Sequence, residues 1–415
     1  MKLCIQMRHI LFMATALGLS SRAWTQENTD SEPQDSEPQD SEPAEAAAEL
    51  QESLLLDTAS AAPPEIDLTA YTSQTFTKPQ LQVSMFSDIG LLLSDNFTTN
   101  EVQTGQLVFH TIANLTRGFS ALTEVTLDST PEPMAAVQRL IFHWEKNDAL
   151  RISAGRYHLP LTWWNTTAHH GLWLQTTARR PRMLDYENSF IPNHAIGVFI
   201  SGNLPALRPL GIRYNVALSG GGDDHHSHEE SSTMEMDTME SADMSEDPSA
   251  ATLNALLALE PPAFPYLRIG VSGLLELGML DHETNTTRVL ASHIAYTSDR
   301  PELIVEGVFV SHEMGSNAHH GGDDYETHNS FAGYAQFAWR LQSLGERLKP
   351  YSRFEYVKVH QSDPNLQNSS DFTGLLGGIR IDLNRSISLK FDTNWNFIEQ
   401  PESAMDANVQ LSAAW

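Results

Sequence analysis

The side chains best suited to chemistry gather in one stretch, residues 155–193. It holds three tryptophans, one histidine pair and three arginines within four positions: Trp163, Trp164, Trp173, His169, His170, Arg179, Arg180 and Arg182. Guanidinium groups crowded into a narrow site of low dielectric constant would favour anions. The alternative pairs these arginines with Asp185 and Glu187 in an ordinary network that stabilises a loop. The tryptophans indicate a packed loop core or rim rather than a platform on which sugars stack.

Two further segments combine histidine with carboxylates, and methionines follow the first of them. Their candidate ligands are Asp223, Asp224, His225, His226 and His228 in one segment, and His319, His320, Asp323, Asp324 and His328 in the other. Neutral imidazole and carboxylate are suitable ligands for Zn²⁺, Cu²⁺ and Ni²⁺. We expect weak capture of such an ion, to which His169 and His170 also contribute, and no required cofactor. The alternative is a hydrated acidic loop in which histidine is incidental.

Enzyme motifs are missing from the sequence. It contains no Gly-x-Ser-x-Gly elbow, no His-Glu-x-x-His pair and no phosphate-binding glycine loop. We therefore predict that the protein is not an enzyme. A hydrolase with a surface Ser-His pair remains open, because such a site has no local motif.

The charge balance is strongly acidic. The chain has 25 basic and 53 acidic residues and a formal net charge of −28. Nucleic-acid binding needs basic side chains that neutralise phosphates, so this balance excludes a nucleic-acid partner as the default. The excess of acid indicates attraction of cations, or simple solvation.

Residues 1–26 read as a secretory signal peptide. Lys2 and Arg8 precede an apolar run over residues 10–19, and small residues follow near position 23. The run is too short to cross a bilayer as a helix, and no later segment reaches the roughly 20 apolar residues that a span needs. Cys4 is the only cysteine of the chain. We therefore expect neither a disulfide nor a thiolate metal site after the signal is removed.

Residues 27–79 form a different kind of segment. The pentad Ser-Glu-Pro-Gln-Asp occupies positions 31–35 and 36–40 and changes to Ser-Glu-Pro-Ala-Glu at 41–45. Acidic, proline-punctuated repeats bury too little apolar surface to fold. We predict a short, disordered N-terminal leader that serves as an exposed spacer. An arm that contacts peptidoglycan or a partner is the alternative.

From residue 81 onward the chain alternates between apolar and polar residues. In residues 386–397, Ile387, Leu389 and Phe391 share one face, whereas Lys390 and Asp392 share the other. Soluble strands average about 5–6 residues, but a tilted strand that spans a membrane needs about 9–11. The segments of this chain have the longer length. They therefore favour a transmembrane antiparallel β-barrel, all-β in class, whose apolar face meets lipid.

Sixteen such segments can be counted within residues 80–415. They lie near 81–93, 101–112, 117–128, 137–146, 149–158, 194–203, 210–219, 250–259, 265–277, 288–297, 301–313, 329–341, 349–360, 372–383, 386–397 and 405–415. An even count places both ends of a bacterial barrel on the periplasmic side. The long connections then all fall on the outer side, and the compact ones fall on the inner side. The stretch 159–193 becomes the third outer loop.

The alternation also predicts which charged side chains line the lumen. They are Arg139, His143, Arg213, Glu306, Arg380, Lys390 and Asp392. Mixed signs across a pore create a transverse field that orients polar solutes, which is a modest filter.

Aromatic residues near the strand ends suit the girdles that lie at the membrane interfaces. They are Trp144, Tyr157, Trp339, Tyr351 and Trp395. The final residue, Trp415, ends an alternating strand, as is typical of bacterial barrel proteins.

The pattern as a whole resembles the sixteen-stranded bacterial porins. The runs at 155–160, 164–166 and 169–176 look like a porin-like outer-membrane subgroup with His-rich loops. This resemblance implies a third loop that folds inward and narrows the pore. It also implies an outer-membrane location, contact with lipid and lipopolysaccharide, and a homotrimer as one assembly.

These observations lead to one expected function and one alternative. We expect an outer-membrane channel for passive diffusion of ions or small polar solutes, whose His- and Asp-rich outer loops capture divalent metal. The alternative is a metal-binding surface barrel without open-channel activity.

Overall fold

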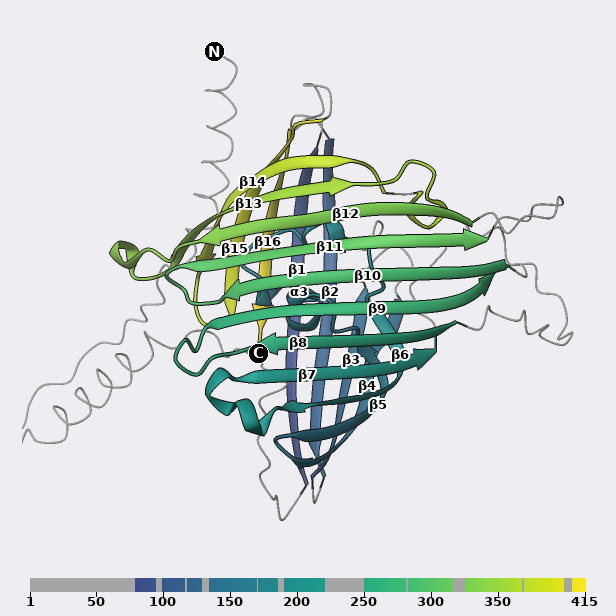
Figure 1. Cartoon of the computed structure of the whole chain (residues 1–415). Helices are drawn as coiled ribbons and strands as arrows, with labels where there is room; N and C mark the ends of the chain where they lie inside the picture. Colours follow the sequence, from purple (N-terminus) through teal and green to yellow (C-terminus); the bar gives the residue numbers. More distant parts are fainter. Residues whose placement is uncertain are drawn as a thin grey trace, which may run out of the picture. The chain divides into compact units, whose positions relative to one another are not determined.

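The structure, a computed structural model, contains a closed barrel of sixteen antiparallel strands (Figure 1). It describes residues 79–94, 99–115, 118–128, 134–169, 171–185, 190–220, 250–280, 283–315, 325–367, 369–398 and 405–415. The expected signal peptide and all but the last residue of the expected leader lie outside these ranges. No helix among the described residues is long and apolar enough to cross a membrane.

The strands follow one another around the barrel in sequence order. They are β1 (Gln80–Ser94), β2 (Thr99–Asn114), β3 (Phe119–Asp128), β4 (Met134–Asn147), β5 (Leu150–His158), β6 (His194–Asn203), β7 (Ile212–Gly220), β8 (Ala251–Leu259), β9 (Leu267–Leu280), β10 (Glu283–Tyr296), β11 (Glu302–Gly315), β12 (Tyr325–Ala338), β13 (Leu348–Lys358), β14 (Phe372–Asp382), β15 (Ile387–Asn396) and β16 (Met405–Ala414). The predicted strand number and fold class are confirmed, and the segment predicted near 250–259 forms the eighth strand.

Pairing between β1 and β16 closes the barrel. The register runs from Phe86 opposite Ala414 to Leu93 opposite Ala407. The Met85 N–H donates to the Trp415 carbonyl at 2.8 Å, and the Trp415 N–H donates back to the Met85 carbonyl at 3.0 Å. Closure leaves no unpaired sheet edge, which is a requirement for strands that cross a hydrocarbon layer.

The two faces of the strands differ in polarity. Apolar side chains such as Leu257, Leu290 and Phe354 project outward and are exposed, whereas Lys390 and Asp392 project inward and are buried. A large exposed apolar surface on a closed barrel is stable only in contact with lipid. The barrel is therefore of the outer-membrane kind.

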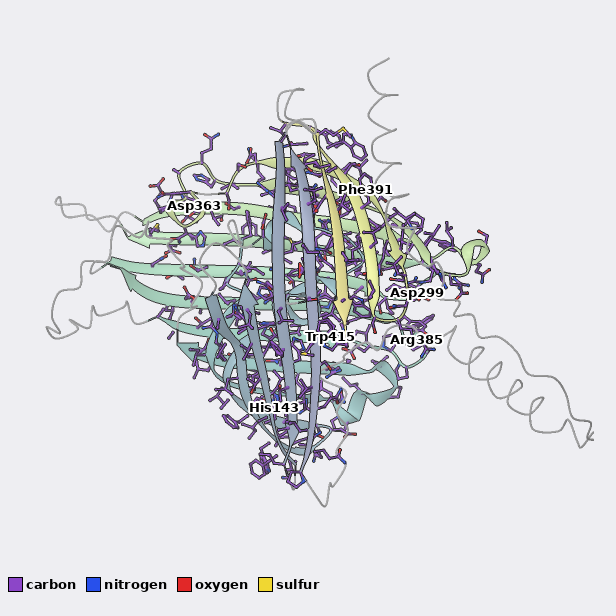
Figure 2. All side chains as sticks on the ribbon, turned by 180° about the vertical axis from the view of Figure 1, so that it is seen from behind. His143, Asp299, Asp363, Arg385, Phe391 and Trp415 are labelled. Carbon is purple, nitrogen blue, oxygen red and sulfur yellow. The ribbon has the colours of Figure 1, made fainter. Side chains whose placement is uncertain are left out.

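The connections at the two ends differ in length. The connections from β4 to β5 and from β14 to β15 are among the short ones, and the longest described one joins β5 to β6. In Figure 2, Asp299 and Arg385 lie in short turns toward one end of the strands, whereas Asp363 lies in a longer connection toward the other. The predicted sidedness of loops and turns agrees with this arrangement.

Some predicted boundaries are wrong. Strand β12 ends at Ala338, although the alternation suggested residue 341. Beyond Ala338 the regular ladder ends, although the Arg340 N–H donates to the Asp299 carbonyl at 2.9 Å and Leu341 forms an isolated bridge with Leu348. Strands β9 and β10 extend to Leu280 and from Glu283, so their hairpin loop is much shorter than predicted. The additional residues at the start of β10 include Thr284, Thr286 and Thr287, which favour extended backbone.

The predicted aromatic girdle needs one correction. Trp144, Trp339 and Trp395 are exposed on the outer surface, as interfacial aromatics should be. Tyr157 and Tyr351 are buried instead. They lie on the inward face, and the hydroxyl of Tyr351 lies 3.3 Å from the Asp392 carboxylate.

A pair of cations anchors the turn between β10 and β11. Asp299 lies 3.1 Å from Lys349 Nζ and 3.1 Å from Arg340 Nε, so that three segments meet at this carboxylate. Burial raises the pKa of Asp299, but Lys349 and Arg340 outweigh it and hold the pKa below the ordinary 3.8. The turn is therefore most stable when Asp299 is ionised.

Replacing Asp299 by asparagine is expected to destabilise the barrel by roughly 1.5 kcal/mol at neutral pH, because the hydrogen bonds to a charged acceptor are weakened. The folded-state pKa is lowered, so the contribution is present above the ordinary pKa and is lost as the pH falls through the lowered pKa. Denaturant unfolding in lipid vesicles at neutral and acidic pH measures this difference. An equal difference between the two proteins at both pH values would contradict the assignment.

Candidate functional site

The connection between β5 and β6 lies inside the barrel. It contains the short helix α3 (Trp163–Thr167) and two 3₁₀ turns, η1 (Leu172–Leu174) and η2 (Arg182–Leu184). Its backbone bonds to inward side chains of distant strands, including Ser272 of β9 and Asp392 of β15. We call residues 159–193 the lumen loop, and its described residues thus extend from β5 and β6 to the opposite wall.

The root of the lumen loop, where its two ends leave β5 and β6, is fixed by one buried amide. Asn165 Nδ2 donates to the carbonyl of Leu159 at 2.9 Å and to that of Asn193 at 3.0 Å. The Leu159 N–H also donates to the Asn193 carbonyl at 2.9 Å. Both ends of the loop are therefore joined through α3, which makes its entry into the barrel rigid.

Apolar packing holds parts of both halves of the lumen loop. Leu159, Leu161, Trp164, Met183 and Leu184 are buried in one cluster with inward side chains of the wall. The wall members include Ile112, Leu122, Ile141, Leu274, Val289, Ile304, Val308, Val310, Ala332 and Val357. These inward positions are apolar because they face the loop rather than water, so the lumen surface is not uniformly polar.

A carboxylate of the wall caps helix α3. Glu306 of β11 accepts the backbone N–H groups of Trp163 at 2.7 Å and Trp164 at 3.1 Å. The hydroxyl of Tyr334 donates to the same carboxylate at 2.5 Å. The first N–H groups of a helix have no partner within the helix, and a carboxylate satisfies them well. The predicted lumen residue Glu306 thus holds the loop.

Arg353 of β13 holds the second half of the lumen loop. Its Nη1 donates to Thr177 Oγ1 at 2.9 Å and to the Arg179 carbonyl at 3.0 Å, and its Nη2 donates to the Arg180 carbonyl at 2.7 Å. Its Nε donates to Glu355 Oε1 at 2.8 Å. Every nitrogen of this fully buried guanidinium has an acceptor, which compensates the cost of burying its charge.

Two more predicted lumen cations bond to loop carbonyls. Arg380 Nη1 donates to the carbonyls of Trp173 and Gln175, at 3.0 Å each, and its guanidinium lies over the Trp173 ring. Lys390 Nζ donates to the carbonyls of Leu172 and Thr177. Cations of the far wall thus bind the backbone of the loop directly.

The three clustered arginines have different partners. Arg179 forms ion pairs with Asp392, at 3.0 Å, and with Asp406. Arg180 donates to the His169 carbonyl at 2.8 Å and lies over the Trp164 ring. Their contacts are therefore partly with the wall and partly within the loop.

Arg182 is the most solvent-accessible of the three arginines. Its side chain is 42% exposed, and its Nη1 lies 3.6 Å from the Asp185 carboxylate. Its backbone N–H donates to Glu355. The structure pairs Asp185 with one of the three arginines, as the alternative interpretation of the sequence suggested, and Glu187 lies outside the described residues.

The remaining predicted lumen residues lie apart from the far wall. Arg139 pairs with the fully buried Glu124, and its Nε donates to Glu124 Oε2 at 3.0 Å. His143 lies 2.7 Å from Ser153 Oγ. Arg213 pairs with Glu260 at 3.2 Å beside the turn from β8 to β9. Arg213 is therefore near the inner end of the barrel rather than at the lumen loop.

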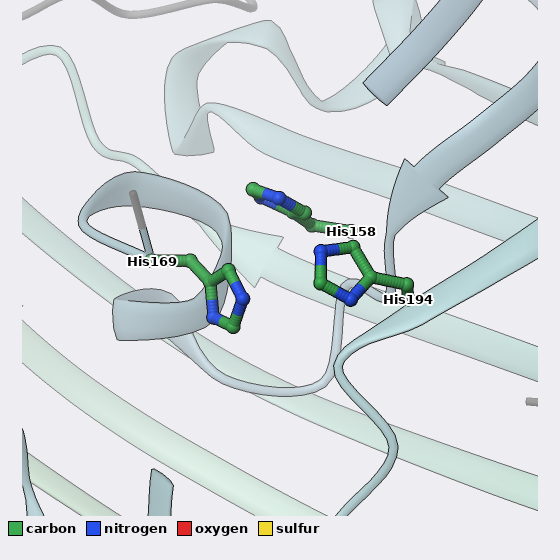
Figure 3. Close-up of side chains that lie close together, drawn as sticks. All are labelled: His158, His169 and His194. Atoms are coloured by element: carbon green, nitrogen blue, oxygen red, sulfur yellow. The ribbon is translucent and has the colours of Figure 1, made fainter. Parts of the chain in front are cut away.

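Of the predicted metal ligands, His169 lies in a buried cluster with two other histidines. The rings of His158, His169 and His194 are in mutual contact, with centroid separations of 4.7, 4.9 and 4.8 Å. One ring nitrogen from each lies within 4.8 Å of the others, and Figure 3 shows the rings close together. Among the described residues this is the group with metal-binding geometry. The sequence analysis did not assign His158 or His194 as ligands.

The other predicted ligands do not join this cluster. His328 lies near the outer end of β12, where its Nδ1 is 3.2 Å from that of His360. The rest, namely His170, Asp223, Asp224, His225, His226, His228, His319, His320, Asp323 and Asp324, lie outside the described residues.

The comparisons with known proteins point to one fold. No protein-family description and no curated protein matches the sequence. The barrel is similar to an anion-selective porin from Comamonas acidovorans, with a TM-score of 0.52 and 10% identity over 81% of this chain and all of that one. It is also similar to OmpF of Salmonella typhi in complex with daunomycin, with a TM-score of 0.51 and 13% identity over 81% of this chain and 97% of that one.

The trimer form of OmpT, an outer membrane protein of Vibrio cholerae, gives a comparable result. Its TM-score is 0.50 at 8% identity, over 81% of this chain and 100% of that one. Sequence identities this low support a common fold and nothing further. The strand number, the closed sheet and the apolar outer surface agree with it. The protein is a sixteen-stranded β-barrel with the fold of the bacterial outer-membrane porins.

Proposed function

We propose that this protein is a passive channel of the bacterial outer membrane for ions or small polar solutes. The closed barrel, its lipid-facing outer surface and its porin fold support this assignment. The single observation that carries it is the course of the lumen loop, which runs from β5 to the inward faces of β9 and β15. A fixed loop inside a barrel limits the size of the solutes that pass, and it leaves the outer surface free for lipid.

The charged groups around the lumen loop suggest how solutes are discriminated. Arg179 and Arg380 each pair with a wall carboxylate, Asp392 and Asp382 respectively. Because these charges are paired, they create an electric field across the pore but carry little net charge. Arg182 is the best candidate in this cluster for direct contact with a permeating anion, because its side chain is half exposed.

Metal capture by the outer loops is a further part of the proposal. It rests on the His- and Asp-rich composition of residues 221–230 and 319–328. Loops at the outer rim that bind Zn²⁺, Cu²⁺ or Ni²⁺ weakly would concentrate these ions near the channel mouth.

The assembly and the surroundings follow from the same fold. We propose a homotrimer, as recorded for OmpT of Vibrio cholerae. The exposed apolar belt would contact lipid and lipopolysaccharide, or a neighbouring protomer.

One observation favours the second candidate, a barrel that mounts metal-binding loops without conducting. The apolar cluster of the lumen loop is continuous from Ile112 of β2 to Val308 of β11, on opposite sides of the loop. A loop that fills the lumen and blocks the channel would show such packing. The two candidates differ in permeability, so permeability decides between them.

Liposome swelling with the refolded full chain tests the channel. We expect vesicles that contain the folded barrel to swell in small sugars and to swell progressively less as the sugar grows. A batch of the chain that is kept unfolded and added to the same vesicles serves as the control. If folded barrels give no swelling even in the smallest solute, the channel is excluded and the mounted-loop function replaces it.

A further inference from the structure

The three-histidine cluster occupies the root of the lumen loop. His158 is the last residue of β5 and His194 is the first of β6, and the two are direct partners in the register. Paired residues of neighbouring strands carry their side chains on the same face, about 5 Å apart. The barrel itself therefore sets the spacing of these two imidazoles.

The third imidazole is positioned by helix α3. Thr162 caps the helix through the Asn165 N–H at 3.1 Å, and the Ala168 N–H closes it by donating to the Trp164 carbonyl at 2.8 Å. His169 follows immediately, and its own carbonyl accepts from Arg180 at 2.8 Å. The backbone is thus held at Ala168 and at His169, and the His169 ring contacts those of His158 and His194.

The environment suits imidazole as a ligand. All three rings are buried, away from bulk solvent. Metal ions bind neutral imidazole through a ring nitrogen. The ligand atoms already lie within 4.8 Å of one another, whereas a tetrahedral zinc site requires nitrogens about 3.3 Å apart. Small ring rotations would close that difference.

The carboxylate of Glu124 lies beside the histidine cluster. Glu124 Oε1 lies 3.7 Å from His158 Nε2, and Arg139 holds the other oxygen of Glu124. Carboxylates commonly orient metal-bound histidines from outside the ligand shell. Arg139 and Arg180 also bring positive charge near the site, which would weaken the binding of a dication relative to a closed structural zinc site.

We propose that His158, His169 and His194 form a binding site for a late first-row divalent metal ion, Zn²⁺ in the first place, inside the barrel. The ion would join both ends of the lumen loop to helix α3 and thereby fasten the loop at its root. This site is separate from the His- and Asp-rich outer loops, and its occupancy does not depend on whether the barrel conducts. The competing explanation is a purely packed cluster of neutral imidazole rings with no affinity for metal.

Cobalt titration of the refolded full chain tests the site, because four-coordinate Co²⁺ absorbs strongly in the visible range. The background protein carries asparagine at His225, His226, His228, His319, His320 and His328, which removes the histidine ligands predicted for the outer loops. We expect one equivalent of Co²⁺ with intense visible bands, which Zn²⁺ then displaces. If the folded background protein binds neither Co²⁺ nor Zn²⁺, the proposal is overturned.

A matched pair of variants assigns the ligands. His169→Asn in the same background is expected to abolish the intense bands, and His194→Asn is expected to do the same from the strand side. His293→Asn removes a buried histidine of β10 that lies outside the cluster, so it should leave the titration unchanged. Heat-dependent migration on gels verifies that each variant is folded. Bands that persist in both folded cluster variants would place the metal elsewhere and refute the site.

Discussion

Replacing Arg353 by methionine is expected to release the second half of the lumen loop and to raise the single-channel conductance. The substitution removes three hydrogen bonds to Thr177, Arg179 and Arg180, and it leaves Glu355 without its cation. Breaking a buried charge pair costs about 3–5 kcal/mol. Because each 1.4 kcal/mol is tenfold, the detached population should rise by a factor of about 100 to 4,000.

Planar-bilayer recording measures this effect. The matched control is Arg288→Met in β10, since Arg288 forms an exposed pair with Glu313 at 2.5 Å, away from the lumen loop. An exposed ion pair contributes about 0–1 kcal/mol, so the control should conduct like the unmodified protein. A folded Arg353 variant with unchanged conductance and unchanged open-channel noise would show that Arg353 does not hold the loop in place.

Replacing Leu290 by arginine is expected to destabilise the barrel in a bilayer by about 2–4 kcal/mol, because the residue would place a charge at the middle of the lipid-facing belt. Leu290 lies at the centre of β10 and is 58% exposed on the outer surface. Reversible unfolding in lipid vesicles gives the difference in free energy.

The matched control for Leu290 is Leu303→Arg. Leu303 is also exposed and apolar, but it is the second residue of β11, beside the turn from β10. Near the membrane interface the cost of arginine falls to about 0–1 kcal/mol. Equal destabilisation at the two positions would mean that the outer surface of the barrel does not face a membrane in the expected orientation.

The fold was predictable because its signals are local. A strand such as β15 alternates at every residue, and the position of its turn is marked by Asn384 and Arg385. Pairing order then follows from connecting neighbours in sequence, since a barrel of this kind has no crossovers. Boundaries were harder to predict, as at the end of β12.

The partners of the lumen loop could not be predicted, because they lie far away in sequence. Trp163 bonds to Glu306, which lies 143 positions later in the sequence, and Arg179 bonds to Asp392, which lies 213 positions later. Neither spacing leaves a local pattern. One signal was nevertheless present. Apart from Glu306 and Gly307, residues 303–310 are apolar on both faces, as in strands that are covered on both sides. Such a strand in a barrel implies that something packs inside it.

The histidine cluster shows the same limit on a smaller scale. His158 and His194 bracket the loop at its two ends, and the register of β5 and β6 makes them partners. That pair could have been found from the predicted strand ends. The addition of His169 depends on the turn of α3 and on Arg180, which only the folded loop specifies.

The most direct measurement is planar-bilayer recording of the refolded, unmodified full chain. A barrel whose lumen is narrowed by a fixed loop should give discrete, stable conductance steps from each inserted molecule. Steps of this kind are the result that the proposed channel predicts. A preparation that is folded, inserted and electrically silent would contradict it, and would make the lumen loop a plug.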